Sequence, residues 1–339
     1  MQPAIDRVAS GQSLDADEMA EIINHCMSGE ADPAQVAQLL LALNRKGETA
    51  AELVGAARAM RQFMTPIRCA RRPVIDTCGT GGGSSGVFNI STAAAIVAAA
   101  AGAVVAKHGN RKSTSQSGSA DALQALGVNI ECPIETVERC LNELGLGFCF
   151  APLFHPSVKH VTAVRRSLSC PTIFNLLGPL CNPAGTEYQL LGAGRAETRE
   201  VLAAALAELG CTKGLVVHGR DGLGEVSHTT ITDVSRIDQG QVMVTTLQPQ
   251  DFGIEPGELQ PIRVTTPQAS ADMIHHVLEG HPGPAHDVVA INAAAALWIV
   301  GLADNLAAGR QLCDDAIHSG RARQLLADLV RITNDHCGN

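Results

Sequence analysis

Residues 76–121 contain two polar, glycine-rich loops, and each loop follows an expected strand and precedes an expected helix. The first reads DTCGTGGGSSGVFNIST over residues 76–92, and the second reads KHGNRKSTSQSGSAD over residues 107–121. Glycines let backbone N–H groups come close to a ligand, and helix N-termini attract anions. Lys107 and Arg111 add positive charge to the second loop. The two loops therefore predict a site for a ligand that carries phosphates at both ends.

From about residue 71 onward, short β-branched segments alternate with Ala-rich segments. This alternation predicts an α/β fold with a central, mostly parallel sheet flanked by helices, and ligand-binding loops at the carboxyl ends of the strands. The expected strands are residues 73–76, 103–106 and 214–219, with 242–247 as an outer strand. The expected helices are residues 91–101, 120–126 and 287–302.

The first seventy residues are expected to be helical. Asp32-Pro33 is typical of a helix start, and Thr49 with Glu52 fits a capping box that opens a helix through about residue 61. The leucines of residues 39–43 could pack a helical unit or form a dimer surface. We therefore expect a small all-helical domain over residues 1–70, joined by a proline-rich crossing segment near 155–183. The larger α/β domain is expected to comprise residues 71–154 and 184–339.

Composition excludes several classes of protein. The net charge of −9 argues against a nucleic-acid binder, and aromatic residues at 3% are too few for base stacking. No apolar run suits a bilayer, and the N-terminus lacks the pattern of a signal peptide. The eleven cysteines are scattered without a CxxC pair, which favours reduced thiols in a cytoplasmic protein. Cys78 could be a nucleophile, but a packing role is favoured because nothing marks a histidine partner.

The first loop matches neither the dinucleotide-binding fingerprint nor the Walker loop. Its glycines could form a tight turn or a phosphate cradle. Ser91 and Thr92 at the helix start could cap the helix, and a serine hydroxyl there could also bind Mg²⁺ held by a diphosphate.

The second loop has a more specific composition, because two cations, a histidine and an asparagine surround Gly109. Hydroxyl and amide side chains that suit phosphate and ribose follow at Ser113, Thr114, Ser115, Gln116, Ser117 and Ser119. A solvated surface loop is the alternative.

Two further segments carry candidate binding groups. Residues 154–166 include His155 and Arg165, and a cation there could hold a carboxylate of a second substrate or simply lie at the surface. Residues 221–225 (DGLGE) could form a turn, or Glu225 could be a ligand of Mg²⁺.

Together these segments resemble the anthranilate phosphoribosyltransferase family of tryptophan biosynthesis, whose fold is similar to that of pyrimidine nucleoside phosphorylases. The resemblance extends from about Asp15 to the last helices. The matching segments are residues 46–49 (KGET), 88–92 (FNIST), 107–111 (KHGNR), 117–121 (SGSAD), 150–152 (FAP), 155–156 (HP), 164–166 (VRR), 172–185 (TIFNLLGPLCNPAG), 287–289 (DVV) and 292–297 (NAAAAL).

The resemblance implies roles for residues at the family's site positions. Phosphoribosyl pyrophosphate would be bound by Gly79, Gly82, Gly83, Asn89, Ile90, Ser91, Thr92, Lys107, His108, Gly109, Asn110, Arg111, Ser115 and Ser119. Catalysis would depend on Lys107, Asn110 and Arg111. Anthranilate would be bound by Gly79, Asn110, His155 and Arg165, and Mg²⁺ by Ser91 and Glu225.

The implied reaction is displacement at the ribose C1 by the anthranilate amine, with release of pyrophosphate. The arylamine is neutral at pH 7, so the main demand is to stabilise the departing pyrophosphate and the cationic sugar. The family also implies a homodimer formed through the helical domain, small-molecule substrates, and neither a nucleic-acid nor a membrane partner.

Three positions depart from the family pattern. Gly83 replaces an acidic residue, Val87 replaces a hydroxyl residue, and Gly224 replaces the first acid of an Asp-Glu pair. Ser84, Ser85 or Asp221 could substitute for the lost groups. The alternative hypothesis is one Mg²⁺ ion in place of two. A paralogue with another aromatic amine acceptor or weak activity, or a paralogue that binds nucleic acid, is the alternative function.

Overall fold

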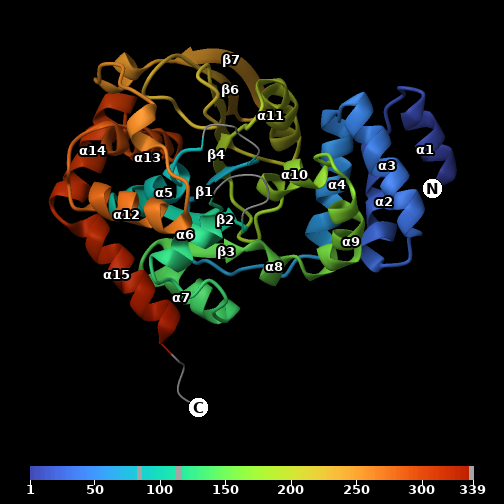
Figure 1. The fold of residues 1–339 in the computed structure, drawn as a ribbon, viewed down its shortest axis with the longest axis horizontal. Helices are drawn as coiled ribbons and strands as arrows, with labels where there is room; N and C mark the ends of the chain where they lie inside the picture. The colour runs from blue at the N-terminus through green and yellow to red at the C-terminus, as the bar shows by residue number, and fades with distance from the viewer. Residues whose placement is uncertain (82–85, 112–116, 336–339) are drawn as a thin grey trace.

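The computed structural model describes residues 1–81, 86–111 and 117–335, which form two lobes (Figure 1). The smaller lobe is helical and holds the N-terminus. The larger lobe is an α/β unit built on a seven-stranded sheet. The expected fold class is confirmed. No helix within these residue ranges is both long and apolar enough to cross a membrane.

The helical lobe begins with four helices, α1 (Gln2–Ala9), α2 (Ala16–Ser28), α3 (Pro33–Lys46) and α4 (Ala50–Gln62). Asp32 caps α3 by accepting from the backbone N–H of Ala34, and Thr49 with Glu52 forms the expected capping box of α4. Two helices of the crossing segment, α9 (Lys159–Ser167) and α10 (Phe174–Leu177), lie against this lobe (Figure 1). Leu39, Leu40 and Leu43 are buried in its core, so most of the leucine stripe packs the lobe itself.

The sheet has the strand order β3-β2-β1-β4-β5-β6-β7. Neighbouring strands are parallel from β3 to β5, and the β5–β6 and β6–β7 pairs are antiparallel. The expected outer strand is β7, at the edge of the sheet (Figure 1). The strands are β1 (Val74–Gly79), β2 (Val104–Gly109), β3 (Leu146–Phe150), β4 (Tyr188–Gly192), β5 (Lys213–Gly219), β6 (Thr232–Asp238) and β7 (Gln241–Leu247).

Successive strand residues point to opposite faces of the sheet, and both faces of its centre are buried. Ile75, Val105 and Leu190 join the core on the face that packs against α5 and α13. Leu191 and Val216 join the core that includes α11 and the helical lobe. The remaining helices are α5 (Ile90–Ala100), α6 (Ser119–Ala125), α7 (Ile134–Glu143), α8 (Ala151–Phe154), α11 (Arg199–Glu208), α12 (Pro267–Leu278), α13 (Pro284–Ile299), α14 (Leu306–His318) and α15 (Arg321–Asn334).

Successive strands of the chain are added first on one side of β1 and then on the other. Strands β2 and β3 follow on one side of β1, and β4 and β5 follow on the other. Loops at the carboxyl ends of such strands diverge and leave a crevice, which is where α/β sheets bind ligands. The two glycine-rich loops follow β1 and β2, so the topology brings both of them to this crevice.

Candidate active site

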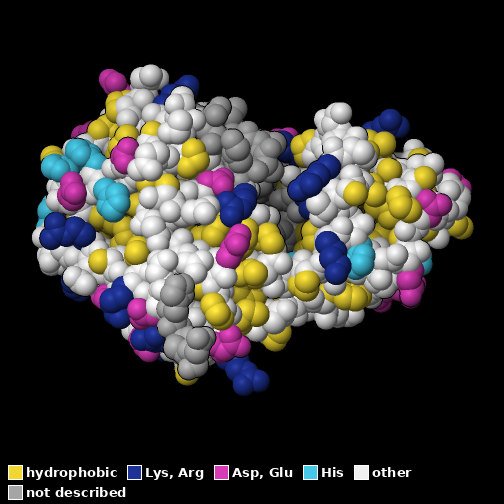
Figure 2. Space-filling view, turned by 60° about the horizontal axis from the view of Figure 1, so that its bottom comes forward, with side chains coloured by type: hydrophobic (Ala, Val, Ile, Leu, Met, Phe, Trp, Pro, Cys, Tyr) yellow, Lys and Arg dark blue, Asp and Glu magenta, His cyan; other side chains and the backbone are white. Residues whose placement is uncertain are grey.

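A cavity of about 260 Å³ lies at the carboxyl ends of β1, β2 and β4. The molecular surface is hollowed between the two lobes, with Lys, Arg, Asp and Glu side chains at the rims (Figure 2). Four groups of residues line the cavity: the first loop with the start of α5, the second loop with the start of α6, the end of β4, and the loop that follows β5. The first two groups are the loops that the sequence singled out.

Lys107 provides a buried cation beside this cavity. Its side chain is almost wholly inaccessible, and its Nζ donates to the carbonyl oxygen of Thr77 at 2.5 Å and to Oγ of Ser91 at 3.2 Å. Burial lowers the pKa of Lys107, and the nearby charge of Asp76 opposes that lowering. The ammonium group is therefore placed to interact with an anion at the start of α5.

Asp76 supports Lys107 from the neighbouring strand. One carboxylate oxygen accepts from the backbone N–H of His108 at 3.1 Å, and the other accepts from Nδ2 of Asn182 at 2.8 Å. Burial raises the pKa of Asp76, whereas the Asn182 hydrogen bond and the charge of Lys107 lower it. Asp76 thus supplies a counter-charge below the cavity and holds the start of the second loop.

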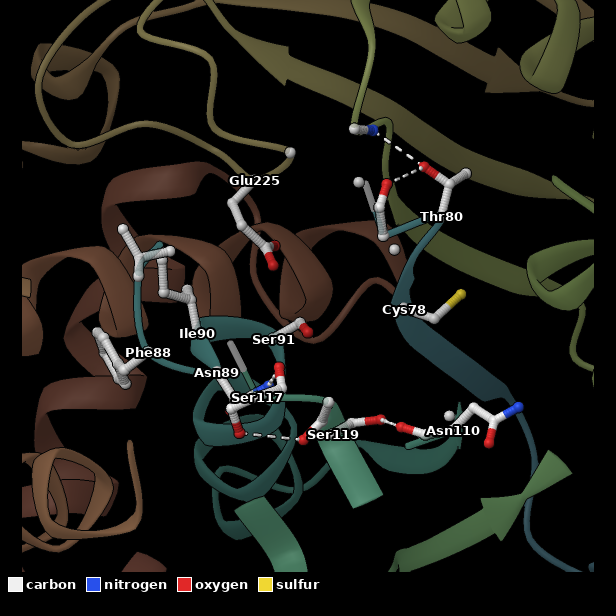
Figure 3. A pocket seen from close by; sticks show the side chains of 18 of the residues that line it. Cys78, Thr80, Phe88, Asn89, Ile90, Ser91, Asn110, Ser117, Ser119 and Glu225 are labelled. Atoms are coloured by element: carbon white, nitrogen blue, oxygen red, sulfur yellow. Dashed lines mark hydrogen bonds between the residues drawn. The ribbon is translucent and has the colours of Figure 1, made fainter. Parts of the chain in front are cut away.

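Ser91 and Glu225 face one another across the cavity, and the Glu225 carboxylate points toward the first turn of α5 (Figure 3). Burial raises the pKa of Glu225 to about 7, although the charge of Lys107 and the polar groups of Ser91 lower it. A carboxylate and a hydroxyl are both oxygen donors of the kind that Mg²⁺ prefers. These two residues fit a Mg²⁺ site whose remaining ligands would come from water or a phosphate.

The described residues of the loop around Glu225 supply no second carboxylate to the cavity. The carboxylate of Asp221 accepts from the hydroxyls of Ser227 and Thr229, each at 2.6 Å, and from the backbone N–H of Leu223 at 3.1 Å. Asp221 also lies outside the cavity lining. The Asp221 carboxylate therefore stabilises its own turn. Gly224 has no side chain that could bind a metal ion.

Arg111 lines the cavity through its loop, but its guanidinium group contacts acidic and amide side chains. It donates to Oε1 of Gln124 at 2.9 Å and to Oε1 of Glu131 at 3.2 Å, and it lies 3.6 Å from Asp121. It also lies over the ring of Phe150. Arg111 would have to exchange these partners for a phosphate in order to bind one directly.

His108 and His155 form a buried, neutral pair with ring centroids 5.1 Å apart. Burial lowers the pKa of His108 to about 3 and that of His155 to about 4. Nδ1 of His108 lies 2.8 Å from the carbonyl oxygen of Gly178, so that nitrogen carries the proton. Nε2 of each ring is buried without a hydrogen-bond partner in the described part of the chain. Nε2 of His108 is consequently a free acceptor.

Arg165 lies on α9 with its guanidinium 5.1 Å from the ring centre of Phe174. Its side chain is half-buried, and burial lowers its pKa. No Asp or Glu of the described residues forms an ion pair with it. This guanidinium is stacked on an aromatic ring and remains open to a carboxylate.

The structure brings most of the expected site residues together. Those that line the cavity are Gly79, Asn89, Ile90, Ser91, Lys107, His108, Gly109, Asn110, Arg111, Ser119 and Glu225. Thr92 is buried behind the cavity, and His155 and Arg165 lie outside its lining. Gly82, Gly83 and Ser115, and the possible substitutes Ser84 and Ser85, lie outside the described residues.

Several residues that shape the cavity were assigned no role from the sequence. Asp76 and Asn182 act from positions 106 residues apart. Gly192 also lines the cavity, and a Cβ on it would lie 1.8 Å from the carbonyl oxygen of Gly224. Only glycine therefore permits the loop before Glu225 to lie against β4. Cys78 is buried with its pKa raised well above the usual range, which fits the packing role.

Two family models describe the chain. Residues 2–64 match the helical bundle domain of a glycosyl transferase family, and residues 71–323 match the a/b domain of a glycosyl transferase family. The fold and the cavity are therefore those of a glycosyltransferase of the helical-bundle and α/β type.

Individual relatives identify the family within this class of glycosyltransferases. Anthranilate phosphoribosyltransferase of Rhodopirellula baltica is 47% identical, with 96% of each chain covered, and that of Laribacter hongkongensis is 45% identical over 98% of each chain. The chain belongs to the anthranilate phosphoribosyltransferase family. The crystal structure of the Thermus thermophilus enzyme has a TM-score of 0.91 at 40% identity, covering 97% of this chain and 99% of that one. The Saccharomyces cerevisiae enzyme in complex with PRPP and Mg has a TM-score of 0.89 at 27% identity, covering 99% and 98%.

Proposed function

We propose that this protein transfers the phosphoribosyl group of 5-phosphoribosyl 1-pyrophosphate to the amine of anthranilate, giving N-(5-phosphoribosyl)anthranilate and pyrophosphate. The observation that carries this proposal is the contact of Lys107 with Ser91 at the N-terminus of α5. It places a buried cation at a helix start, inside a cavity of a family that performs this reaction. Relatives at more than 40% identity carry this activity in their names. Among the described residues, no contact favours the paralogue or nucleic-acid alternatives.

Phosphoribosyl pyrophosphate would occupy the cavity between the two glycine-rich loops. Lys107 and the first turn of α5 would stabilise negative charge that develops on the departing pyrophosphate. Asn110 and Arg111 would act from the second loop. The other proposed contacts are with Gly79, Gly82, Gly83, Asn89, Ile90, Thr92, His108, Gly109, Ser115 and Ser119.

One Mg²⁺ ion would be held by Ser91 and Glu225 together with the substrate's phosphate oxygens. When bound, this cation would neutralise charge on the diphosphate. Glu225 must be ionised to hold it, and Lys107 favours that ionised form. We propose a single ion because Asp221 is bound within its own turn and Gly224 has no donor.

Anthranilate would lie next to Gly79 and Asn110, with the Arg165 guanidinium on its carboxylate and His155 beside its ring. The open acceptor at Nε2 of His108 suits the amine N–H of the acceptor substrate. That contact would orient the nitrogen lone pair toward C1, and the imidazole could accept the proton that the amine loses on forming the new C–N bond. Enclosure between the lobes would exclude water from the activated sugar.

The assembly and location follow from other parts of the chain. We propose that residues 1–70 form the helical domain and that α1 and α3 pair with the same helices of a second copy. A groove between them is lined by Ile5, Val8 and Leu41. Every cysteine in the described ranges is free, which suits the reducing cytoplasm.

An assay of anthranilate fluorescence tests the activity. Addition of phosphoribosyl pyrophosphate and Mg²⁺ should make the fluorescence decay in the presence of the protein and not in its absence. Decay no faster than that of the protein-free control, with folded protein verified by circular dichroism, would overturn the proposal.

A further inference from the structure

Asn89 occupies the N-cap position of α5, yet its side chain does not cap the helix. An N-cap asparagine ordinarily accepts a hydrogen bond from the second or third backbone N–H of its helix. In α5 the second N–H belongs to Ser91, and Ser91 lines the cavity. Some other contact must therefore hold the Asn89 amide away from its usual position.

Ser270 provides that contact from α12, which is 181 residues further along the chain. The Ser270 hydroxyl donates to Oδ1 of Asn89 at 2.8 Å and accepts from the backbone N–H of Asn89 at 2.9 Å. The Ser270 side chain is fully buried, so water does not compete for either bond. Oδ1 of Asn89 therefore accepts its hydrogen bond from α12 and not from the N-terminus of α5.

The opposite side of the same amide is held by the second loop. Nδ2 of Asn89 donates to the backbone carbonyl of Ser117 at 3.2 Å, just before α6 begins (Figure 3). Asn89 therefore joins two elements that line the cavity, α5 and the end of the second loop, to α12, which does not line it. The Asn89 amide keeps this orientation because the Ser117 carbonyl accepts from its Nδ2 and the Ser270 hydroxyl donates to its Oδ1.

The neighbouring backbone is anchored independently of Ser270. The N–H of Phe88 donates to the carbonyl of Ile262 at 3.1 Å, and the N–H of Val264 donates to the carbonyl of Gly86 at 2.9 Å. These bonds place the end of the first loop whether or not residue 270 carries a hydroxyl. Removal of that hydroxyl should therefore change the Asn89 side chain more than the path of the main chain.

We propose that Ser270 is a positioning residue for the phosphoribosyl pyrophosphate site. It holds the Asn89 amide against α12, so that the Ser91 N–H faces the cavity and the two loops keep their spacing. This inference rests on the proposed function of the cavity. Ser270 itself does not line the cavity, and its effect on substrate passes through Asn89.

The test compares Ser270→Ala with the wild-type protein. Without the hydroxyl, Oδ1 of Asn89 is free to turn back and cap α5, which competes with an anion for the Ser91 N–H. The KM for phosphoribosyl pyrophosphate should rise about tenfold, the scale of one or two lost hydrogen bonds. The KM for anthranilate should change less than about twofold.

Ser235→Ala is the matched control. Ser235 is also fully buried, and its hydroxyl accepts from Arg199 on the far side of the α/β lobe. This variant should leave both KM values unchanged. Thermal unfolding of both variants separates a loss of stability from a loss of substrate binding. Ser270→Cys, which keeps the size of the side chain with weaker hydrogen bonds, replaces the alanine variant if the latter does not fold, and it should raise the same KM.

A double-mutant cycle asks whether the effect passes through Asn89. In an Asn89→Ala background, Ser270→Ala should raise the KM no further. An unchanged KM in a folded Ser270 variant, or the same tenfold rise in both backgrounds, would overturn the inference. Titration calorimetry with phosphoribosyl pyrophosphate keeps the two proposals distinguishable. A wild-type protein that binds this substrate but does not consume anthranilate contradicts only the proposed function, and the affinities of the variants then decide the role of Ser270.

Discussion

The ammonium group of Lys107 lies 3.2 Å from the hydroxyl of Ser91, which joins the end of β2 to the first turn of α5. Glu225, from the loop that follows β5, lines the same cavity and points toward the first turn of α5 (Figure 3). A cation, a hydroxyl and a carboxylate from three separate segments thus form one side of the cavity. This arrangement can stabilise a pyrophosphate only if all three segments keep their positions.

Replacement of Lys107 by methionine tests whether the positive charge of this side chain contributes to catalysis. Methionine preserves much of the volume and removes the charge and both hydrogen bonds of Nζ. We expect kcat/KM to fall by about a hundredfold or more, the scale seen when a preorganised electrostatic group is removed. Steady-state rates with saturating Mg²⁺ measure the change.

Lys213→Met is the comparison for that variant. Lys213 is half-buried, and its Nζ donates to the backbone carbonyl of Trp298, remote from the cavity. Its loss should leave kcat/KM within about twofold of wild type. Equal losses of activity in the two lysine variants would show that Lys107 acts only through general stability.

The raised pKa of Glu225, about 7, makes Mg²⁺ binding depend on pH. The carboxyl group must lose its proton to hold the cation, so protons compete with the metal below pH 7. The affinity should fall by about tenfold for each pH unit between 7 and 5 and should be constant above pH 8. Calorimetric titration of Mg²⁺ in the presence of phosphoribosyl pyrophosphate measures this slope.

The raised pKa of Glu225 also determines how the stability of the metal-free protein changes with pH. Folding favours the protonated carboxyl, so the metal-free protein should lose stability as pH rises from about 4.5 to 7 through the titration of this group. Glu225→Gln should remove that part of the dependence. A metal affinity that stays flat between pH 5 and 7 would show that another group holds the ion.

Much of the fold could be predicted from local patterns. Asp32-Pro33 and the Thr49–Glu52 pair marked helix starts, because capping depends on residues within one turn. The strands around Ile75 and Val105 were recognisable from β-branched residues. β3, β4 and β6 were not predicted. In β3, for example, Gly147 interrupts a short segment, and its strand conformation depends on pairing with β2.

The candidate site was only partly predictable for the same reason. Lys107 and Ser91 belong to motifs within single loops, so their residue types already suggested phosphate binding. The partners of those motifs come from distant segments, as with Asp76 and Asn182 or Asn89 and Ser270. The contact of Arg111 with Glu131 could not be predicted either, because it joins residues 20 positions apart that meet only in the folded chain.

Gly224→Asp tests whether a lost carboxylate limits metal binding. The new carboxylate would lie next to Glu225 at the cavity and supply oxygen ligands for a further Mg²⁺ ion. We expect turnover to depend more steeply on Mg²⁺, with half-saturation at a lower concentration. A Cβ at this position would lie 3.2 Å from the carbonyl oxygen of Ala193, so a small shift of the loop accompanies the change.

Gly224→Asn is the control, because it has nearly the same shape without the charge. It should show any effect of the loop shift while its Mg²⁺ titration stays close to that of wild type. If the aspartate and wild-type titrations superimpose, the missing acid has no influence on metal binding and the single-ion proposal loses this support.

Arg165→Met tests recognition of the acceptor carboxylate. The guanidinium lies against Phe174, and no acidic side chain of the described residues pairs with it. Loss of a charged hydrogen-bonding partner should raise the KM for anthranilate by about ten- to a hundredfold. The KM for phosphoribosyl pyrophosphate should stay within about twofold, because the cavity between the loops is unchanged.

Arg166→Met supplies the matched control on the same helix. Arg166 is exposed, and its neutralisation changes the net charge of α9 by the same amount as that of Arg165. A rise in the anthranilate KM confined to the Arg165 variant would therefore reflect a direct contact and not the general field of the helix. Since surface charges act weakly through water, the Arg166 variant should differ little from wild type. Equal rises in both variants would mean that α9 attracts anthranilate only by its overall charge, and the carboxylate would then have to be bound elsewhere.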